Sequence, residues 1–477
     1  MLSRRKFLSS AAFFAAVSGR GWGSKVAAAA RPRVFRPEDF GAKGDGKTND
    51  SAAFAALSQA VTDAGGGVIK LRKVTYVVGA QGRADGGDGT WLYAPGKLLE
   101  LEGCTGPLTI KGGGARLLCA DGLRYGTFDL QTGEPRANAM PYTGPGRATP
   151  YTAMIQISNC TGPVEISDLE LDGNSGAHKL GGGFGDTGFQ IPSSGLFLRD
   201  NKGSEVVRNV FAHHHGLDGL YLDGVDRDLA DGQTRLISDF RSEYNGRQGC
   251  SIIGGRGYRF ERCAFSHTGK GKIQSAPGAG VDFEPEGKAV RDLAFDQCEF
   301  SDNSGCGMVA DNGDSEGVRF VDCTFVGTTN WSIWPKKPHF RFERCTFVGS
   351  LVNTFGDDDP ARAVQFAGCT FSDDPARSPT GKVYLGQANG PIADLWTARN
   401  ILFDGCRFEL VADAVLPWTR NVIYRDCRMR QSAAKVAYPR GKYLGTNEIT
   451  GNVDLAGSSV TGTLQVNGQM MKPGVIG

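Results

Sequence analysis

Phe320-Val321-Asp322-Cys323-Thr324-Phe325 is one of seven copies of a single pattern, Phe-x-x-Cys-x-Phe, in the second half of the chain. The other copies begin at Phe260, Phe295, Phe342, Phe366, Phe403 and Tyr424, the last with Tyr and Met in place of the two Phe residues. Successive cysteines of the pattern are 35, 25, 22, 24, 37 and 21 residues apart. A spacing that keeps returning to one length, with occasional longer intervals, is typical of a solenoid whose coils carry loop insertions.

Each coil also holds a second short strand, which starts with glycine. Five segments align in this way: Gly195–Arg199, Gly219–Asp223, Gly249–Ile253, Gly280–Glu284 and Gly307–Asp311. Their second and fourth residues are apolar throughout. Because side chains alternate between the two faces of a strand, these residues are expected to point inward and the third and fifth to point outward. Short strands between Gly, Asn and Asp turns, without long helical patterns, predict an all-β protein with a parallel β-helix.

The seven cysteines of the repeat occupy one position in it. No CxxC pair or Cys/His cluster at zinc spacing accompanies them in the sequence. We therefore expect a ladder of buried cysteines inside the solenoid, where the thiol behaves as a small apolar group.

The first 30 residues resemble an export signal. Arg4-Arg5 precedes the apolar stretch Leu8–Val17, and Ala27–Ala30 forms a small-residue cleavage zone. This pattern is similar to a twin-arginine signal. The resemblance implies a periplasmic or secreted protein that begins near Arg31 and has no membrane segment once the signal is removed. Since twin-arginine substrates are exported after folding, it also implies mostly free thiols.

A capping helix is predicted next. Thr48-Asn49-Asp50-Ser51 offers N-cap residues for a helix that continues to about Asp63, and Gly65-Gly66-Gly67 ends it. We expect this helix to cover the N-terminal end of the solenoid, which would otherwise expose core and strand edges.

The segment Asp39-Phe40-Gly41-Ala42-Lys43-Gly44-Asp45-Gly46-Lys47-Thr48-Asn49-Asp50, followed by that helix, resembles the opening of the pectate-lyase-like right-handed parallel β-helix superfamily. The resemblance implies a right-handed β-helix and an activity among polygalacturonase-like hydrolases (rhamnogalacturonases included), polysaccharide lyases, epimerases and phage tailspike enzymes. Its Gly and Asp residues shape turns and do not specify the chemistry. The Asn-Thr-Asp, Gly-His-Gly and Arg-Ile-Lys motifs of the hydrolases are not found intact, nor is the Asp-Pro-His motif of alginate epimerases.

These observations predict four segments. Residues 1–30 are the signal, 31–65 an N-terminal strand and the capping helix, 66–430 the β-helix, and 431–477 C-terminal strands and a tail. Long inserts near 121–151 and 175–194 carry Tyr125, Tyr142, Tyr151, Phe184 and Phe189, which could wall a cleft.

Stacking the aligned segments produces two outward columns of side chains. The first contains Phe197, Tyr221, Ser251, Asp282 and Val309; the second contains Arg199, Asp223, Ile253, Glu284 and Asp311. Adjacent coils lie ~4.8 Å apart and same-face residues of one strand ~6.7 Å apart, so Asp282, Glu284 and Asp311 are predicted to cluster, with Asp223 at about 10 Å. Repulsion between like charges makes it unfavourable for all carboxyl groups this close to ionise, so at least one of them is expected to keep its proton near neutral pH.

This cluster predicts a glycoside hydrolase with Asp282, Glu284, Asp311 and Asp223 as catalytic residues. The same-strand pair Asp282 and Glu284 suits the ~6.5–9.5 Å separation of inverting enzymes, which we favour, and Glu284 with Asp311 suits the ~5–5.5 Å of retaining ones. The predicted substrate contacts are Tyr221, Arg247, Arg199, His215 and Glu286. Metal binding by the adjacent histidines of His213-His214-His215 is not expected, because neighbours on an extended chain point to opposite faces.

Two alternatives stay open. A polysaccharide lyase would use Arg247, Lys272, His215 or Tyr221 as the base beside a uronate carboxylate neutralised by a cation such as calcium. A non-catalytic carbohydrate-binding β-helix is the other. The expected partner in each case is a polysaccharide or oligosaccharide. With 53 basic and 51 acidic residues, nothing favours a nucleic acid. No cofactor is predicted apart from that calcium, and the chain could be a monomer or a homotrimer.

Overall fold

The structure is a computed structural model that describes residues 32–83, 91–92, 95–136, 147–182, 190–387 and 390–477. The predicted export signal lies outside the described residues, as do Tyr142, Phe184 and Phe189 of the predicted inserts. Residues Arg33–Gly477 form one compact unit, described below. Of the helices within the described ranges, none has the length and apolar character needed to cross a membrane.

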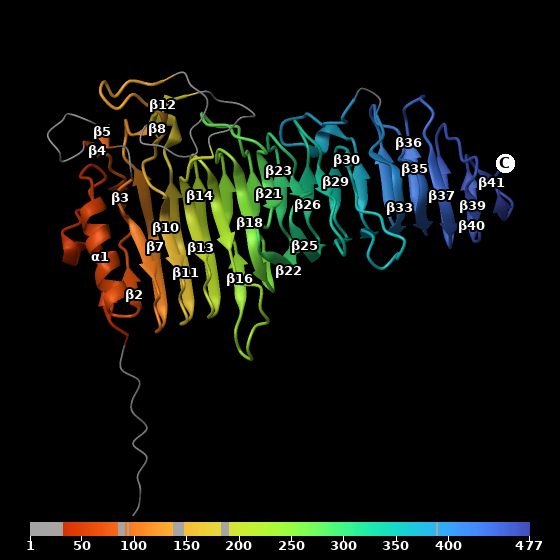
Figure 1. Ribbon diagram of the computed structural model, residues 1–477. Helices are drawn as coiled ribbons and strands as arrows, with labels where there is room; N and C mark the ends of the chain where they lie inside the picture. Colours follow the sequence, from red (N-terminus) through yellow and green to blue (C-terminus); the bar gives the residue numbers. More distant parts are fainter. Residues whose placement is uncertain (1–31, 84–90, 93–94, 137–146, 183–189, 388–389) are drawn as a thin grey trace, which may run out of the picture. The chain divides into compact units, whose positions relative to one another are not determined.

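Parallel strands stack coil upon coil in chain order and form three faces (Figure 1). The first face contains β1 (Val34–Phe35), β2 (Gly67–Lys70), β7 (Leu108–Cys119), β11 (Val164–Asp172), β14 (Glu205–His213), β16 (Arg235–Ser238), β19 (Tyr258–Glu261), β22 (Ala289–Asp296), β25 (Asp314–Val321), β28 (Arg341–Glu343), β31 (Gln365–Ala367), β33 (Ala393–Asp404), β35 (Trp418–Arg425), β37 (Pro439–Leu444) and β39 (Ser459–Val460).

The second face begins with β3 (Thr75–Val78) and the second halves of β7, β11 and β14. It continues through β17 (Arg241–Glu243), β20 (Ala264–Ser266), β23 (Glu299–Ser301), β26 (Thr324–Val326), β29 (Thr346–Val348), β32 (Thr370–Ser372), β34 (Arg407–Leu410), β36 (Arg428–Gln431), β38 (Thr446–Thr450) and β40 (Thr463–Val466). Parallel pairing therefore continues past residue 430, where the β-helix was expected to end.

The third face contains β6 (Leu99–Glu102), β10 (Ala153–Ser158), β13 (Ser194–Arg199), β15 (Asp218–Asp223), β18 (Gln248–Arg256), β21 (Ala279–Phe283), β24 (Met308–Ala310) and β27 (Ile333–Pro335). The remaining strands are β30 (Leu351–Val352), the C-terminal β41 (Gln469–Met470) and β42 (Gly474–Val475), the pair β4 (Gly82–Arg83) and β5 (Trp91–Leu92), and the small sheet of β8 (Arg124–Thr127), β9 (Arg147–Ala148) and β12 (Lys179–Gly181). Short 3-10 helices span Pro37–Phe40, Ser175–Ala177 and Pro375–Arg377.

The Phe-x-x-Cys-x-Phe pattern forms the corner between the first and second faces. In the coil of β25 and β26, Phe320 is the second-last residue of the first strand, Phe325 lies in the second, and Asp322 between them has a φ of 52°. The residue before each cysteine of the pattern is left-handed, with φ between 52° and 63°: Arg262, Gln297, Asp322, Arg344, Gly368, Gly405 and Asp426. This conformation reverses the alternation of side chains, so that both aromatic residues point inward.

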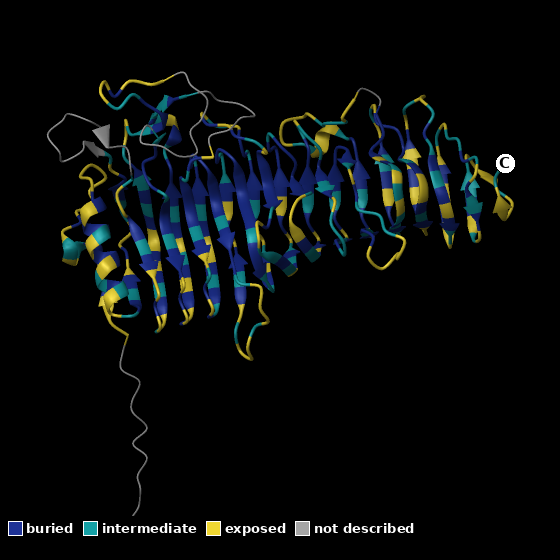
Figure 2. Ribbon diagram, viewed as in Figure 1, coloured by how far each residue is buried: buried dark blue, intermediate teal, exposed yellow. Residues whose placement is uncertain are grey.

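Two stacks of aromatic rings fill the interior behind these corners. Phe320 stacks on Phe295 and Phe342 at centroid distances of 4.8 and 5.0 Å, and Phe325 stacks on Phe300 and Phe347 at 4.7 and 5.2 Å. Figure 2 shows buried residues along the strands, alternating on many of them with exposed ones, and further exposed residues in the loops and on α1. The predicted all-β, right-handed parallel β-helix with its cap is confirmed.

The cap is helix α1 (Ser51–Asp63), which buries Phe54, Leu57 and Val61. Asp50 precedes it, but its carboxylate does not cap the helix. Instead Asp50 accepts hydrogen bonds from the backbone N–H groups of Lys43 and Gly44, at 2.7 and 3.1 Å. Asp50 thus holds the preceding turn against the helix start.

All twelve cysteines are buried and none forms a disulfide. The Sγ of Cys323 lies 3.5 Å from the backbone oxygen of Phe295 in the coil before it. The predicted cysteine ladder is therefore present, with thiols in contact with the coil below.

We predict that thiol titration of the folded protein under non-reducing conditions detects almost no cysteine, because every thiol is buried. After denaturation without reductant, all twelve should react. Fewer than about half reacting would contradict the ladder, since it would mean that disulfides replace it.

Candidate functional site

The third face carries the first predicted column in register. Phe197 pairs with Tyr221, Tyr221 with Ser251, Ser251 with Asp282, and Asp282 with Val309. The column continues to Trp334 on β27. The alignment on the leading glycines therefore gave the correct register for these outward positions.

The second predicted column is correct at its start and wrong at Ile253. Arg199 pairs with Asp223, but Asp223 lies opposite Gly254 because β18 carries one extra residue at this point. Such a bulge takes a residue out of the ladder and bends the strand. In β18 it directs the chain toward the first face, where Gly255 pairs with Val290.

Asp282 lies at the centre of the candidate site. Its side chain is buried and its Oδ2 accepts a hydrogen bond of 2.6 Å from Nε2 of Gln248. Gln248 is itself fixed, because its Oε1 accepts from the backbone N–H of Ala279 at 3.1 Å. Burial raises the pKa of Asp282 well above its ordinary value, and the negative charges of Glu284 and Asp311 add to this effect.

Glu284 and Asp311 are half-buried beside it. Burial raises the pKa of Glu284; Arg247 opposes the shift, and Glu286, Asp218 and Asp311 add to it. The structure thus brings Asp282, Glu284 and Asp311 within electrostatic reach of one another. At least one carboxyl group of this cluster is set to hold a proton at a pH where an isolated carboxyl has lost it.

A cavity of about 340 Å³ lies on the same face, over the coils that precede the acids, and Asp282, Glu284 and Asp311 are not among the residues that line it. Phe197, Arg199, Tyr221, Asp223 and Arg247 contribute to its wall. The rings of Phe197 and Tyr221 meet edge to face at 4.7 Å. An aromatic wall next to proton-holding acids is the arrangement that a sugar-processing cleft needs.

Arg247 has its main partner inside the protein. Its Nε and Nη2 donate to the two carboxylate oxygens of Asp218 at 3.0 and 2.6 Å, and its guanidinium lies 5.8 Å from the centre of the Tyr221 ring. Sequence reasoning missed Asp218 and Gln248, although both precede the leading glycine of an aligned segment. They lie in register on neighbouring strands and build the floor under Tyr221 and Asp282.

Asp223 is held in an ion-pair network. Its carboxylate contacts Nζ of Lys288 and lies 3.2 Å from Nε of Arg199, and Lys288 also binds Asp200 at 2.7 Å. Two cations thus neutralise the buried Asp223, which disfavours the catalytic role predicted for it. The side chain of Arg199 is 52% exposed and Glu286 is exposed, so both can reach a ligand.

His215, which was predicted as a substrate contact, does not reach the surface. His215 is fully buried, with Nδ1 2.9 Å from the hydroxyl of Tyr151 and Nε2 3.1 Å from the backbone oxygen of Leu171. Burial lowers its pKa to about 3, so the ring is neutral. Both ring nitrogens serve to tie the coil together, which removes His215 from the substrate contacts.

The expectation that adjacent histidines point to opposite faces also fails, for His213 and His214. His214 has a φ of 56°, which breaks the alternation. As a result the Nδ1 atoms of the two rings lie 2.7 Å apart.

A second aromatic group lies on the far side of the acids. Trp334 follows Val309 in the column, and Trp331 meets Trp334 and Tyr384 edge to face at 5.6 and 5.8 Å. The sequence signal for it was present, because Ile333-Trp334-Pro335 continues the inward–outward alternation of the aligned segments. The acids are therefore flanked by aromatic side chains along the coil axis.

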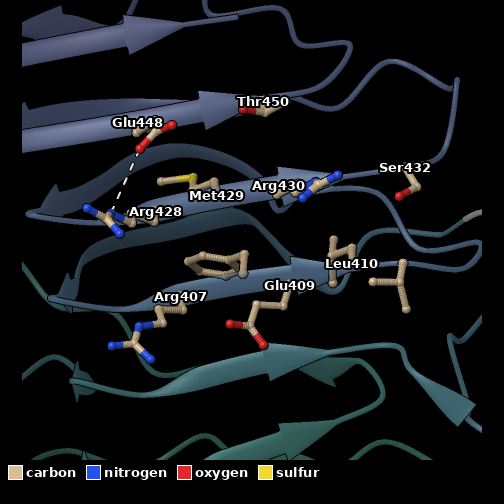
Figure 3. Close-up of a pocket in the computed structure, with 11 residues that line it drawn as sticks. Arg407, Glu409, Leu410, Arg428, Met429, Arg430, Ser432, Glu448 and Thr450 are labelled. Carbon is tan, nitrogen blue, oxygen red and sulfur yellow. Dashed lines mark ion pairs between the residues drawn. The ribbon is translucent and has the colours of Figure 1, made fainter. Parts of the chain in front are cut away.

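A larger cavity, of about 770 Å³, lies on the second face between β34, β36 and β38 (Figure 3). Arginines dominate it, and its acids are paired: Glu448 with Arg428 at 3.8 Å and Glu409 with Arg377 at 2.9 Å. Each of these two acids has an arginine partner and is open to solvent. The third face, where acids are crowded and partly buried, is therefore the better candidate site despite its smaller cavity.

Residues 153–347 match the family model described as a right handed beta helix region. The chain contains a right-handed β-helix. The matched part includes the acids and both aromatic groups of the third face, apart from Tyr384. No curated protein matches the sequence.

Solved structures with this β-helix fold include several carbohydrate-active enzymes. The mannuronan C-5 epimerase AlgE4 A-module of Azotobacter vinelandii is 16% identical, with a TM-score of 0.45 over 90% of this chain and 99% of that one. An exopolygalacturonase from Thermotoga maritima is 13% identical, with a TM-score of 0.35 over 94% and 96%. The tailspike gp49 of Acinetobacter baumannii bacteriophage Fri1, a capsular polysaccharide depolymerase, is 11% identical, with a TM-score of 0.39 over 92% and 64%.

We predict that Asp218→Ala lowers the free energy of unfolding by about 3–5 kcal/mol, because it leaves the buried charge of Arg247 without a partner. Arg199→Ala, which removes an exposed partner of Asp223, should cost no more than about 1 kcal/mol. Denaturant unfolding of both variants measures the difference. Equal, small losses would show that the Arg247–Asp218 pair does not support the floor of the site.

Proposed function

We propose that this chain is a carbohydrate-active enzyme that hydrolyses glycosidic bonds of a polysaccharide or oligosaccharide on its third face. The observation that carries the proposal is the half-buried Glu284, whose pKa is raised beside two further carboxyl groups. Hydrolysis of a glycosidic bond needs a carboxylic acid that keeps its proton until it reaches the leaving oxygen, and a second carboxylate nearby.

Glu284 is the proposed general acid, because it combines partial exposure with a raised pKa. Asp311, on the next coil, is the proposed partner carboxylate. Asp282 is too deeply buried to meet a sugar, so its proposed role is to crowd Glu284 and, through Gln248, to fix the geometry. We propose the retaining arrangement, because Asp311 follows Glu284 by one coil and neighbouring coils lie ~4.8 Å apart, whereas in the inverting pair Asp282 and Glu284 both pKa values are raised.

The aromatic groups on either side of the acids support a sugar ligand. Phe197 and Tyr221 lie on one side and Trp331 and Trp334 on the other, so a chain of sugar rings along the coil axis would meet apolar faces before and after the cleavage point. Arg199 and Glu286 supply exposed polar groups for ring hydroxyls.

The contacts of the candidate lyase bases favour hydrolysis over elimination. Burial raises the pKa of Tyr221 to about 12, and His215 is fully buried. Nζ of Lys272 donates to the backbone oxygens of Gly176 and His178 at 3.0 and 2.8 Å, and Arg247 is paired with Asp218. A base for β-elimination must be free to take a proton from the sugar, and these four side chains are poorly placed to do so.

Glu284→Gln is expected to lower kcat by about 10²–10⁴-fold, the usual contribution of a general acid, and to leave the thermal transition nearly unchanged. The assay incubates the protein with neutral and uronate-containing polysaccharides and measures new reducing ends and ultraviolet absorbance. Glu316→Gln, a half-exposed glutamate on the first face, is the matched control and should retain full activity.

Reducing ends without absorbance would support a hydrolase. Absorbance that rises with them would mean a new C=C bond and contradict the proposal in favour of a lyase. Binding without turnover, unaffected by Glu284→Gln, would contradict it in favour of a carbohydrate-binding β-helix.

The pH profile tests the protonation of Glu284 directly. A general acid works only below its pKa, so kcat/KM should fall as pH rises through the raised pKa of Glu284. Glu286 helps to raise that pKa, and Glu286→Gln should therefore move the alkaline limb to lower pH. An unchanged alkaline limb in Glu286→Gln would contradict the assignment of this limb to Glu284.

A further inference from the structure

A second cluster of reactive side chains lies at the ends of β11 and β14, away from the aligned columns. Asp172 and His213 are in register on these neighbouring strands, and His214 follows directly. One ligand atom from each of Asp172, His213 and His214 can be chosen so that all lie within 4.8 Å of one another.

The left-handed turn at His214 creates this arrangement. The Nδ1 atoms of His213 and His214 are 2.7 Å apart, and Oδ1 of Asp172 lies 3.6 Å from Nδ1 of His213. Asp172 and His213 are buried, whereas His214 is half-buried. The cluster is thus rigid on two sides and open to solvent on the third.

Outer contacts orient every member. Glu170 Oε1 lies 3.2 Å from Nε2 of His213, so that nitrogen carries the proton and Nδ1 directs its lone pair into the cluster. Arg116 binds the other carboxylate oxygen of Asp172, and the backbone N–H of Asn174 donates to Oδ1 at 2.8 Å. A carboxylate behind a histidine is the arrangement that orients and strengthens histidine ligands of metal ions.

Ring stacking fixes the two imidazoles from outside. His213 stacks on Phe211 at 4.2 Å and His214 on Tyr244 at 5.1 Å.

We propose that His213, His214 and Asp172 bind one divalent transition-metal ion of the zinc type, with Glu170 as the residue that positions His213. Two imidazoles and one carboxylate form a ligand set that zinc accepts, with a fourth position left for water. Ligands at ~2.0–2.1 Å around a tetrahedral zinc lie roughly 3.3 Å apart. Oδ1 of Asp172 and Nδ1 of His213, which are 3.6 Å apart, already fit this spacing. The Nδ1 atoms of His213 and His214, which are 2.7 Å apart, would separate by about 0.6 Å when the ion takes the place of the proton between them.

The charge of the neighbourhood agrees with a cation. Asp172, Glu170 and Glu243 contribute three negative charges and Arg116 and Arg241 two positive ones, which leaves one net negative charge around the cluster. The site lies on the second face, outside the proposed hydrolase site on the third face, and its test is independent of that activity.

The test is calorimetric titration of the full chain with Zn²⁺ after removal of metals by a chelator. Saturable binding of one ion per chain is expected. His214→Ala should weaken it at least tenfold, and Glu170→Gln by about 10–100-fold, the usual cost of removing such a positioning partner. His267→Ala is the matched control, because His267 stacks on the other side of Tyr244 at 4.7 Å and pairs with Asp302 outside the cluster. It should bind as the parent chain does.

Cobalt gives a second readout that a merely structural histidine pair would not provide. Co²⁺ added to the metal-free chain should produce visible d–d bands that are lost in His214→Ala. Because His214 is only half-buried, this variant is suitable if His213→Ala fails to fold. The proposal is overturned if the parent chain shows no saturable Zn²⁺ binding, or if His214→Ala binds Zn²⁺ as tightly as His267→Ala does.

Discussion

The turn at the residue before each repeat cysteine is the constraint on which the rest of the β-helix depends. A left-handed non-glycine residue costs of order 1–3 kcal/mol, and Arg262, Gln297 and Arg344 are side chains that rarely adopt it. The turn places two aromatic side chains inside the coil, and burial of each stabilises the fold by about 1.5–3 kcal/mol, with stacking on the next coil adding about 0.5–1.5 kcal/mol. The corner is thus favourable only in a stack, which is why the pattern occurs as a repeat.

The stacked corners hold the coils in one register. This register brings the outward side chains of neighbouring coils together in the candidate site. Asp282 acquires its raised pKa because the neighbouring strands exclude water from it and bring the negative charges of Glu284 and Asp311 close to it. A slip of one residue would send Asp282 inward and Phe283 outward, and would abolish the acid cluster. The chemistry proposed for Glu284 therefore rests on packing at corners on another side of the coil.

Alternation and repetition explain which parts were predictable from the sequence. Both the β-helix and the column from Phe197 to Val309 follow from a period of two along strands and a repeat between coils. The errors occur where the backbone departs from that period. The extra residue of β18 displaced Ile253, and the left-handed His214 changed the direction of its ring. His215 was misplaced because its partners, Tyr151 and Leu171, are distant in sequence.

The short connection from His213 to Asp218 joins the two sites within one turn. His213 and His214 face the proposed metal site, His215 anchors the turn in the interior, and Asp218 holds Arg247 under Tyr221. Gly216 lets the ring of Tyr125 approach closely: a Cβ on it would lie 2.6 Å from that ring, whose hydroxyl also donates to the Gly216 oxygen. The backbone from His213 to Asp218 therefore carries side chains of both candidate sites, and its packing against Tyr125 fixes the position from which Asp218 reaches Arg247.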